Sequence, residues 1–198
     1  MKKSVVVCAA LLFLAVVVPA PVIAAVNFDL GIKAGVSMAN NQWSDDDGTE
    51  KSLIRPTFGV FAVINLNANL AIQPELNYLT MGEWWTVTDG KIVETFSYLH
   101  IPVLIKARLA KQGKFIPVVF AGPALGILLS AKEDGDDVKS FFKSTDFGAD
   151  FGAGAEMAAG NMKLIFDVRY YLGLTNAYNG TGFSMKNRNF ILTVGAIF

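Results

Sequence analysis

Apolar and polar residues alternate with a period of two along most of this chain. The pattern is clearest from Val26 to Met38, where every second residue is apolar and the residues between are polar, charged or glycine. A β-strand places successive side chains on opposite faces, whereas a helix would mix these two sets. The segment therefore predicts a strand with one apolar and one polar face.

The same alternation recurs to the end of the chain. It predicts strands at residues 26–38, 55–65, 70–84, 96–109, 115–130, 147–157, 162–171 and 189–198. Short connections at 66–69, 110–114 and 158–161 alternate with long polar ones at 39–52, 131–145 and 175–186, and residues 85–95 read as a protruding hairpin about Asp89-Gly90. Short turns at one end and long loops at the other are typical of outer-membrane barrels, and an even strand count places both termini at the short-turn end.

Alternation alone does not say which face meets water. In a soluble lipocalin-like barrel the apolar face would line a ligand cavity, and in a membrane barrel it would meet lipid. The polar face decides for the membrane barrel, because small residues relieve crowding in a narrow eight-stranded interior and would only weaken strands on a wet exterior. These small residues are Gly31, Gly35, Gly59, Gly122, Ala124, Gly126, Gly148, Gly152 and Gly154.

The apolar faces also have the size that a membrane requires. They span roughly 9–11 residues, enough for a tilted strand to cross the outer membrane. Aromatic girdles are expected at Phe28, Phe115 and Phe198 on one side and at Tyr78, Trp84 and Tyr170 on the other. The predicted fold is all-β, an eight-stranded antiparallel up-and-down transmembrane β-barrel that follows a cleaved signal peptide.

The first 25 residues do not fit the barrel pattern. Lys2 and Lys3 precede an apolar stretch, Pro19 and Pro21 follow it, and small residues end it, which is the order of a secretory signal peptide. Residues 1–25 are therefore expected to be removed, leaving one barrel domain at 26–198. The only cysteine, Cys8, leaves with them, so no disulfide is expected.

The charge of the remaining chain excludes one class of partner. Without Lys2 and Lys3, 15 of the 17 basic side chains remain against 17 acidic ones. This small negative net charge, without a basic patch, makes nucleic acid an unexpected partner.

Several motifs together resemble a known family. They are Pro74-Glu75-Leu76-Asn77-Tyr78, Tyr98-Leu99-His100-Ile101-Pro102, Ala121-Gly122-Pro123, Asp167-Val168-Arg169-Tyr170 and Gly173-Leu174-Thr175-Asn176. In order and spacing they resemble the PorT-like outer-membrane β-barrel family of Bacteroidota, across essentially the whole mature chain. The resemblance implies a small Gram-negative outer-membrane barrel surrounded by lipid and lipopolysaccharide. The terminal Phe198 is similar to the signal that the barrel assembly machinery reads, so this machinery is an expected partner.

The inward face carries the candidate chemistry. An interior polar network is expected among Glu75, His100, Lys106, Asp150, Glu156, Asp167 and Arg169. Opposite charges inside a closed barrel can pair, which lowers the cost of burial. The lone histidine, His100, would either pack as a structural residue or titrate against Glu75 or Asp167. The charges would either plug the lumen or line a narrow ion path.

The loops carry weaker candidates. Trp43, Asp45, Asp46, Asp47, Asp136 and Asp137 are candidate extracellular contacts. The first acidic loop fails calcium-loop spacing, because Trp43 and Ile54 stand where carboxylates are needed, so no metal or other cofactor is expected.

No enzyme site is expected either. Pro102 stands where the His-x-Ser spacing of outer-membrane lipid-modifying enzymes would need serine. The expected role is structural or adhesive, through loops at 39–52, 85–95, 131–145 and 175–186. The alternatives are a narrow channel, a lipid-modifying enzyme and a soluble ligand-binding barrel.

Overall fold

The computed structural model describes residues 28–39, 41–44, 51–88, 90–110 and 113–198. The expected signal peptide lies outside these residues. Eight long strands form the body: β1 Phe28–Ala39, β4 Ile54–Asn65, β5 Leu70–Val87, β6 Gly90–Arg108, β7 Phe115–Glu133, β9 Thr145–Ala159, β10 Met162–Gly173 and β12 Arg188–Ile197. The short strands β2 Gln42–Trp43, β3 Lys51–Ser52, β8 Asp136–Asp137 and β11 Met185–Lys186 and the 3-10 helix η2 Lys139–Phe141 lie between them.

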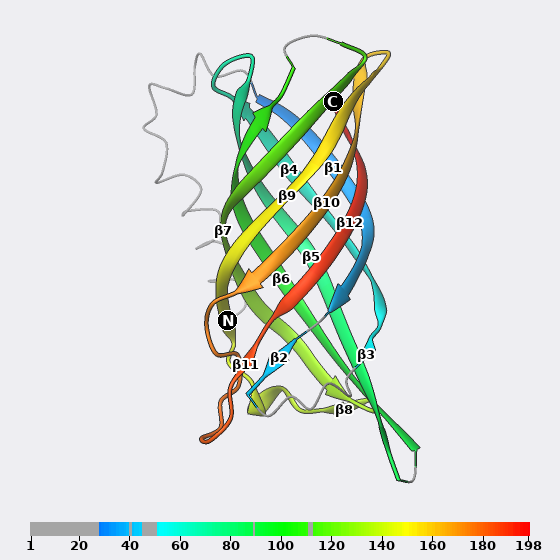
Figure 1. The fold of residues 1–198 in the computed structure, drawn as a ribbon, viewed down its shortest axis with the longest axis vertical. Helices are drawn as coiled ribbons and strands as arrows, with labels where there is room; N and C mark the ends of the chain where they lie inside the picture. Colours follow the sequence, from blue (N-terminus) through cyan, green and yellow to red (C-terminus); the bar gives the residue numbers. More distant parts are fainter. Residues whose placement is uncertain (1–27, 40, 45–50, 89, 111–112) are drawn as a thin grey trace, which may run out of the picture.

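The eight long strands close into a ring (Figure 1). Each pairs antiparallel with its neighbours in chain order, and the pairing of β1 with β12 closes the barrel, with Gly31 opposite Ile197. β1 begins and β12 ends at the end with the short turns, and the long connections gather at the other, lower end in Figure 1. The predicted eight-stranded antiparallel barrel is confirmed. Closure leaves no unpaired sheet edge for lipid to meet.

The apolar face points outward. Phe58 on β4 and Ile105 on β6 are 56% and 65% exposed, whereas the inward neighbour Lys106 is fully buried. A water-soluble protein would not leave such a continuous apolar band uncovered. The band is therefore the lipid-facing surface, as the small residues on the polar face predict. Among the described residues, no helix is long and apolar enough to cross a membrane.

The aromatic girdles agree with the prediction except at one position. Phe28, Phe115 and Phe198 are exposed at the short-turn end. At the other edge, Tyr78 stacks on Phe58 with ring centroids 5.2 Å apart, and Tyr170 packs edge-on against Phe190. Trp84 lies beyond this edge, on the protruding part of β5.

Two lysines hold Trp84 there. The ammonium groups of Lys91 and Lys51 lie 3.7 and 4.9 Å from its ring centroid. The predicted place of Trp84 in the girdle is wrong, because β5 continues as a strand past the lipid-facing band.

The β5–β6 hairpin is longer than the sequence indicates, and its register differs. Pairing Thr88 with Lys91 predicts Leu79 opposite His100 and Gln73 opposite Lys106. In the structure Val87 pairs with Gly90, which places Asn77 opposite His100 and Ala71 opposite Lys106. The register is therefore two residues from the predicted one. Since side chains alternate with a period of two, every inward residue still meets an inward residue.

The interior is more apolar than glycines and paired charges alone would make it. Near the loop end, Leu79, Met81, Phe96, Tyr98 and Tyr171 form part of a buried cluster, and Phe61 and Phe120 belong to smaller clusters nearer the turns. Glycines face these rings: a Cβ on Gly31 would lie 2.3 Å from the Phe61 ring, and one on Gly152 would lie 2.8 Å from the Phe120 ring. The inward glycines thus make room for aromatic side chains as well as for charges.

Candidate functional site

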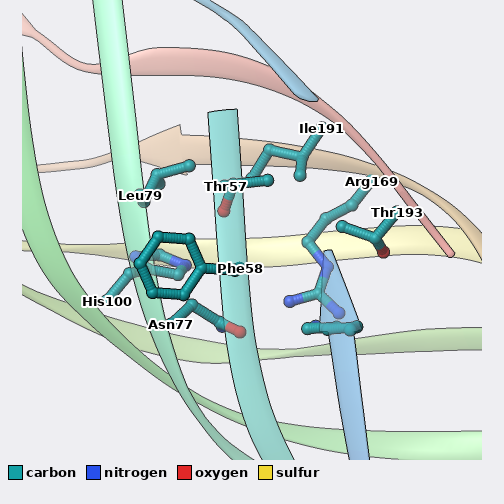
Figure 2. A pocket seen from close by; sticks show the side chains of 9 residues that line it. Thr57, Phe58, Asn77, Leu79, His100, Arg169, Ile191 and Thr193 are labelled. Carbon is teal, nitrogen blue, oxygen red and sulfur yellow. The ribbon is translucent and has the colours of Figure 1, made fainter. Parts of the chain in front are cut away.

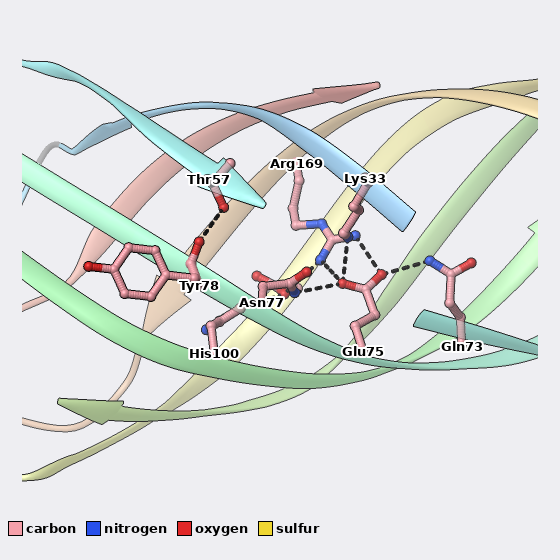
Figure 3. Close-up of polar contacts among 9 residues, drawn as sticks. Lys33, Thr57, Gln73, Glu75, Asn77, Tyr78, His100 and Arg169 are labelled. Atoms are coloured by element: carbon pink, nitrogen blue, oxygen red, sulfur yellow. Dashed lines mark hydrogen bonds and ion pairs between the residues drawn. The ribbon is translucent and has the colours of Figure 1, made fainter. Parts of the chain in front are cut away.

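Glu75 is the centre of a buried polar network in the middle of the barrel (Figure 3). Its two carboxylate oxygens accept hydrogen bonds from Arg169 Nη1 and Nη2 at 2.7 and 2.9 Å, the two-pronged geometry that binds a carboxylate most strongly. Lys33 Nζ adds a bond of 2.6 Å. The side-chain amides of Gln73 and Asn77 donate to the same carboxylate at 2.7 and 2.9 Å. Five donors from β1, β5 and β10 therefore surround one carboxylate.

Asp150 on β9 connects this network to the histidine. Arg169 Nη1 lies 3.3 Å from Asp150 Oδ2, and His100 Nε2 lies 2.9 Å from the same oxygen. The His100 ring also packs edge-on against Tyr171, with centroids 4.8 Å apart. The two partners considered for His100, Glu75 and Asp167, are both wrong. His100 on β6 and Asp150 on β9 lie on either side of β7, and the curvature of the sheet brings their side chains together on its inner face.

A second charged group lies toward the short-turn end. Glu156 accepts bonds from Lys106 Nζ at 3.1 Å and from Arg108 Nε at 2.9 Å. Asp167 is also buried, but its oxygens accept no hydrogen bond from another described residue. The four cations Lys33, Lys106, Arg108 and Arg169 thus face the four anions Glu75, Asp150, Glu156 and Asp167.

The lumen around this network is filled. A cavity of only about 10 Å³ is lined by Lys33, Thr57, Phe58, Asn77, Leu79, His100, Arg169, Ile191 and Thr193 (Figure 2). This is about the space of one water molecule.

The loop end of the barrel is closed by packed side chains. Phe142 packs edge-on against Phe96, with centroids 4.8 Å apart, and Met185 is fully buried beneath the loops. Asp146 accepts bonds from Tyr171 Oη at 2.8 Å and from Asn187 Nδ2 at 2.7 Å. These contacts hold the connection between β10 and β12 over the mouth of the barrel.

The candidate loop residues are dispersed. Trp43 lies on β2, whose backbone pairs with Met185 of β11. Asp136 and Asp137 form the exposed strand β8, which pairs with the end of β7. Asp45, Asp46 and Asp47 lie outside the described residues. In the part of the chain that the structure describes, no three His, Cys, Asp or Glu side chains are grouped to hold a metal ion.

Sequence reasoning omitted several members of these networks. The alternation places Lys33, Gln73, Asn77 and Arg108 on the inward face, but it does not predict that they bond to Glu75 and Glu156. Asp146 and Asn187 were missed too, because they lie where strands meet loops and the alternation is weak. For Lys33, Gln73, Asn77 and Arg108, the signal in the sequence was their position on the inward face of the alternating strands.

Beyond the lipid-facing band, Glu94 is buried on β6 near two other carboxylates. Its strand pairs it with Glu83 on β5 and Glu133 on β7, so the three carboxylates lie on neighbouring strands at one level. Burial, and next the charges of Glu83 and Glu133, raises the pKa of Glu94 to about 8. Glu94 is therefore protonated at neutral pH.

This shifted pKa predicts a pH dependence of stability. The unfolded chain releases the Glu94 proton near its ordinary pKa of 4.5, and the folded chain holds it to about 8. Glu94 therefore contributes its full stability below pH 4.5, and this contribution is lost as the pH rises to 8. Denaturant unfolding at pH 5 to 9 should show a fall in stability across this range that is smaller in Glu94→Gln. Equal pH dependence in both proteins would contradict the assignment.

The closed ring, the lipid-facing exterior and the filled interior together define an integral β-barrel protein of the bacterial outer membrane. A family model described as outer membrane protein beta-barrel domain matches residues 24–179. The chain belongs to this family, and its place is the cell outer membrane. No curated protein matches its sequence at a significant level.

Solved structures show the same fold. The chain is similar to Neisserial surface protein A, with 17% identity and a TM-score of 0.55 over 86% of this chain and 95% of that one. It is similar to OprG from Pseudomonas aeruginosa, with 12% identity and a TM-score of 0.56 over 86% and 95%. It is also similar to the outer membrane protein AlkL, with 14% identity and a TM-score of 0.50 over 86% and 90%. At these identities the likeness concerns the fold alone.

Proposed function

We propose that this protein is a closed outer-membrane barrel that acts through its extracellular loops, in a structural or adhesive role, and does not conduct. The observation that carries the proposal is the two-pronged Arg169–Glu75 ion pair across the centre of the lumen, beside a cavity of only about 10 Å³. An eight-stranded barrel has little interior room even before such a network fills it.

The loops support the second half of the proposal. The β7–β9 connection is tied to the β10–β12 connection by backbone bonds from Lys143 to Ala177 at 2.8 Å and from Asn179 to Phe141 at 2.9 Å. Ordered loops on a rigid scaffold are where binding residues concentrate. Exposed Phe141 and Phe183 lie on these loops, well past the lipid-facing band.

Conductance tests the closed lumen. The refolded protein in a planar bilayer should give no unitary currents, because no wet path passes the Arg169–Glu75 level. A channel-forming barrel refolded in the same way shows that the assay can detect a pore. Reproducible current steps that scale with salt concentration would overturn the proposal and favour the narrow channel.

The enzymatic alternative has its own test. On this proposal the barrel modifies no lipid, so lipid A from cells with and without the gene should have the same mass. A mass difference would favour the lipid-modifying enzyme.

We also propose that the protein belongs to the PorT-like group of outer-membrane barrels. This proposal rests on the order and spacing of the motifs given above.

Assembly and lipid partners are part of the same proposal. Phe198 is 60% exposed at the short-turn end, and its backbone N–H donates to Leu30 O at 2.8 Å. An exposed terminal aromatic beside the closing pair of strands suits recognition by the barrel assembly machinery. The apolar exterior suits contact with outer-membrane lipid and lipopolysaccharide.

A further inference from the structure

An open polar depression lies on the extracellular loops, apart from the buried network. Its volume is about 650 Å³, and it is widely open to solvent. It is lined by Asp137, Lys139, Ser140, Phe142, Ser144 and Asn179. The first five come from the β7–β9 connection and Asn179 from the β10–β12 connection, so the depression lies between two loops.

The backbone around the depression is held in place. The N–H of Phe141 donates to Val138 O at 3.0 Å and that of Phe142 to Lys139 O at 3.1 Å, which forms η2. The N–H of Asn179 donates to Phe141 O at 2.9 Å, which joins the two loops. The buried Phe142 ring packs edge-on against Phe96 and Tyr178. The polar groups at the rim are therefore presented on a firm base, which reduces the entropy lost on binding.

The lining combines groups that suit a polyhydroxylated ligand. Ser140 and Ser144 each donate and accept hydrogen bonds, and the Asn179 amide does both through different atoms. The Asp137 carboxylate accepts hydrogen bonds and the Lys139 ammonium group donates them, so the lining carries one negative and one positive charge. A sugar ring offers several hydroxyls that both donate and accept hydrogen bonds, which matches this mixture of donors and acceptors in the lining.

The surrounding charge argues against an anionic ligand. Residues 132–143 contain Glu133, Asp134, Asp136 and Asp137 against Lys132, Lys139 and Lys143, a net charge of −1. Within the lining itself, Asp137 repels an anionic ligand and offsets the attraction of Lys139, so no excess positive charge is present to hold a sulfated or phosphorylated group. The site suits an uncharged ligand better.

We infer that this depression binds a neutral saccharide unit. The inference deepens the proposed loop-mediated function and rests on it. Neutral saccharides occur both on the bacterium's own lipopolysaccharide and on foreign cell surfaces, and the same lining would suit either source.

A glycan array tests the inference, with the full barrel in lipid nanodiscs. One arm carries lipopolysaccharide core oligosaccharides, a second carries neutral animal glycans, and a third carries sulfated glycans. We expect binding in the first or second arm, and the arm that responds identifies the source. Binding to no neutral glycan, or to sulfated glycans only, would overturn the inference.

Variants assign the binding to the depression. Against the strongest neutral glycan, Ser144→Ala combined with Asn179→Ala should weaken binding about tenfold, since each lost hydrogen bond costs a few-fold. Ser140→Trp should abolish binding by filling the depression. Asn161→Ala, an asparagine in a turn at the opposite end, should bind like wild type. Unchanged affinity in the double variant and in Ser140→Trp would overturn the site.

The two proposals fail separately. Heat-modifiable migration in gels checks that each variant is a folded barrel. A silent bilayer without glycan binding would retain the closed barrel and remove the saccharide site. Current steps would remove the closed barrel whatever the array shows.

Discussion

Replacing Arg169 by alanine is expected to lower the free energy of unfolding of the barrel by about 3–5 kcal/mol. The change removes both prongs of the ion pair with Glu75 and the contact with Asp150, so two buried carboxylates lose a cation. Of the described cations that bond to Glu75, Lys33 is then the one that remains, beside the neutral amides of Gln73 and Asn77. Urea unfolding in lipid vesicles, followed by tryptophan fluorescence, measures the effect.

A partly exposed arginine near the loops, Arg188, provides the matched control. Arg188 Nη2 donates to Gln42 at 2.7 Å on the surface, so Arg188→Ala should cost about 1 kcal/mol or less. The double variant Glu75→Ala/Arg169→Ala should lose less than the two single losses combined, because the residues act as a pair. Equal costs for the two arginines would show that the Arg169–Glu75 pair does not stabilise the barrel.

Replacing Gly122 by alanine is expected to cost about 3 kcal/mol, the upper end of ordinary overpacking. A Cβ on Gly122 would lie 1.9 Å from Val103 O and 2.8 Å from Val103 C. These are backbone atoms of the neighbouring strand β6, so relief requires two strands to move apart. The ladder is already interrupted there, between the pairs Pro102–Ala124 and Ile105–Ala121. The same urea unfolding measures the loss.

Gly126 on the same strand serves as the control. A Cβ there would come no nearer than 3.2 Å, to the Tyr98 side chain, which can shift a few tenths of an ångström. Gly126→Ala should therefore cost about 1 kcal/mol or less. If both glycines tolerate alanine equally, the close approach at Gly122 is not a constraint on the strand pairing.

The sequence was most informative where the period-two pattern ran unbroken. The residues from Phe28 to Met38 are enough to predict β1 and its two faces. Prediction weakened where another force replaced the alternation. β5 and β6 extend past the membrane as a paired hairpin, where Trp84 and Glu83 follow cross-strand contacts and not a lipid boundary.

The sequence predicts which residues belong to the buried site, but it does not predict which of them bond to each other. Parity alone places Glu75, His100 and Arg169 inside the barrel. It cannot say that Arg169 reaches Glu75, 94 residues away in the chain, or that His100 meets Asp150. Those partners depend on how far each strand is staggered against the next and on which strands face each other across the lumen.

The sequence by itself therefore determined the strands and their two faces, because a period of two is a local property of the backbone, and the small residues on the polar face determined that the apolar face meets a membrane. Only the tertiary structure decided which inward charges pair, how completely aromatic side chains fill the remaining space and how two loops meet around a polar depression. Each of these depends on closure of the ring, which brings distant segments within hydrogen-bond reach.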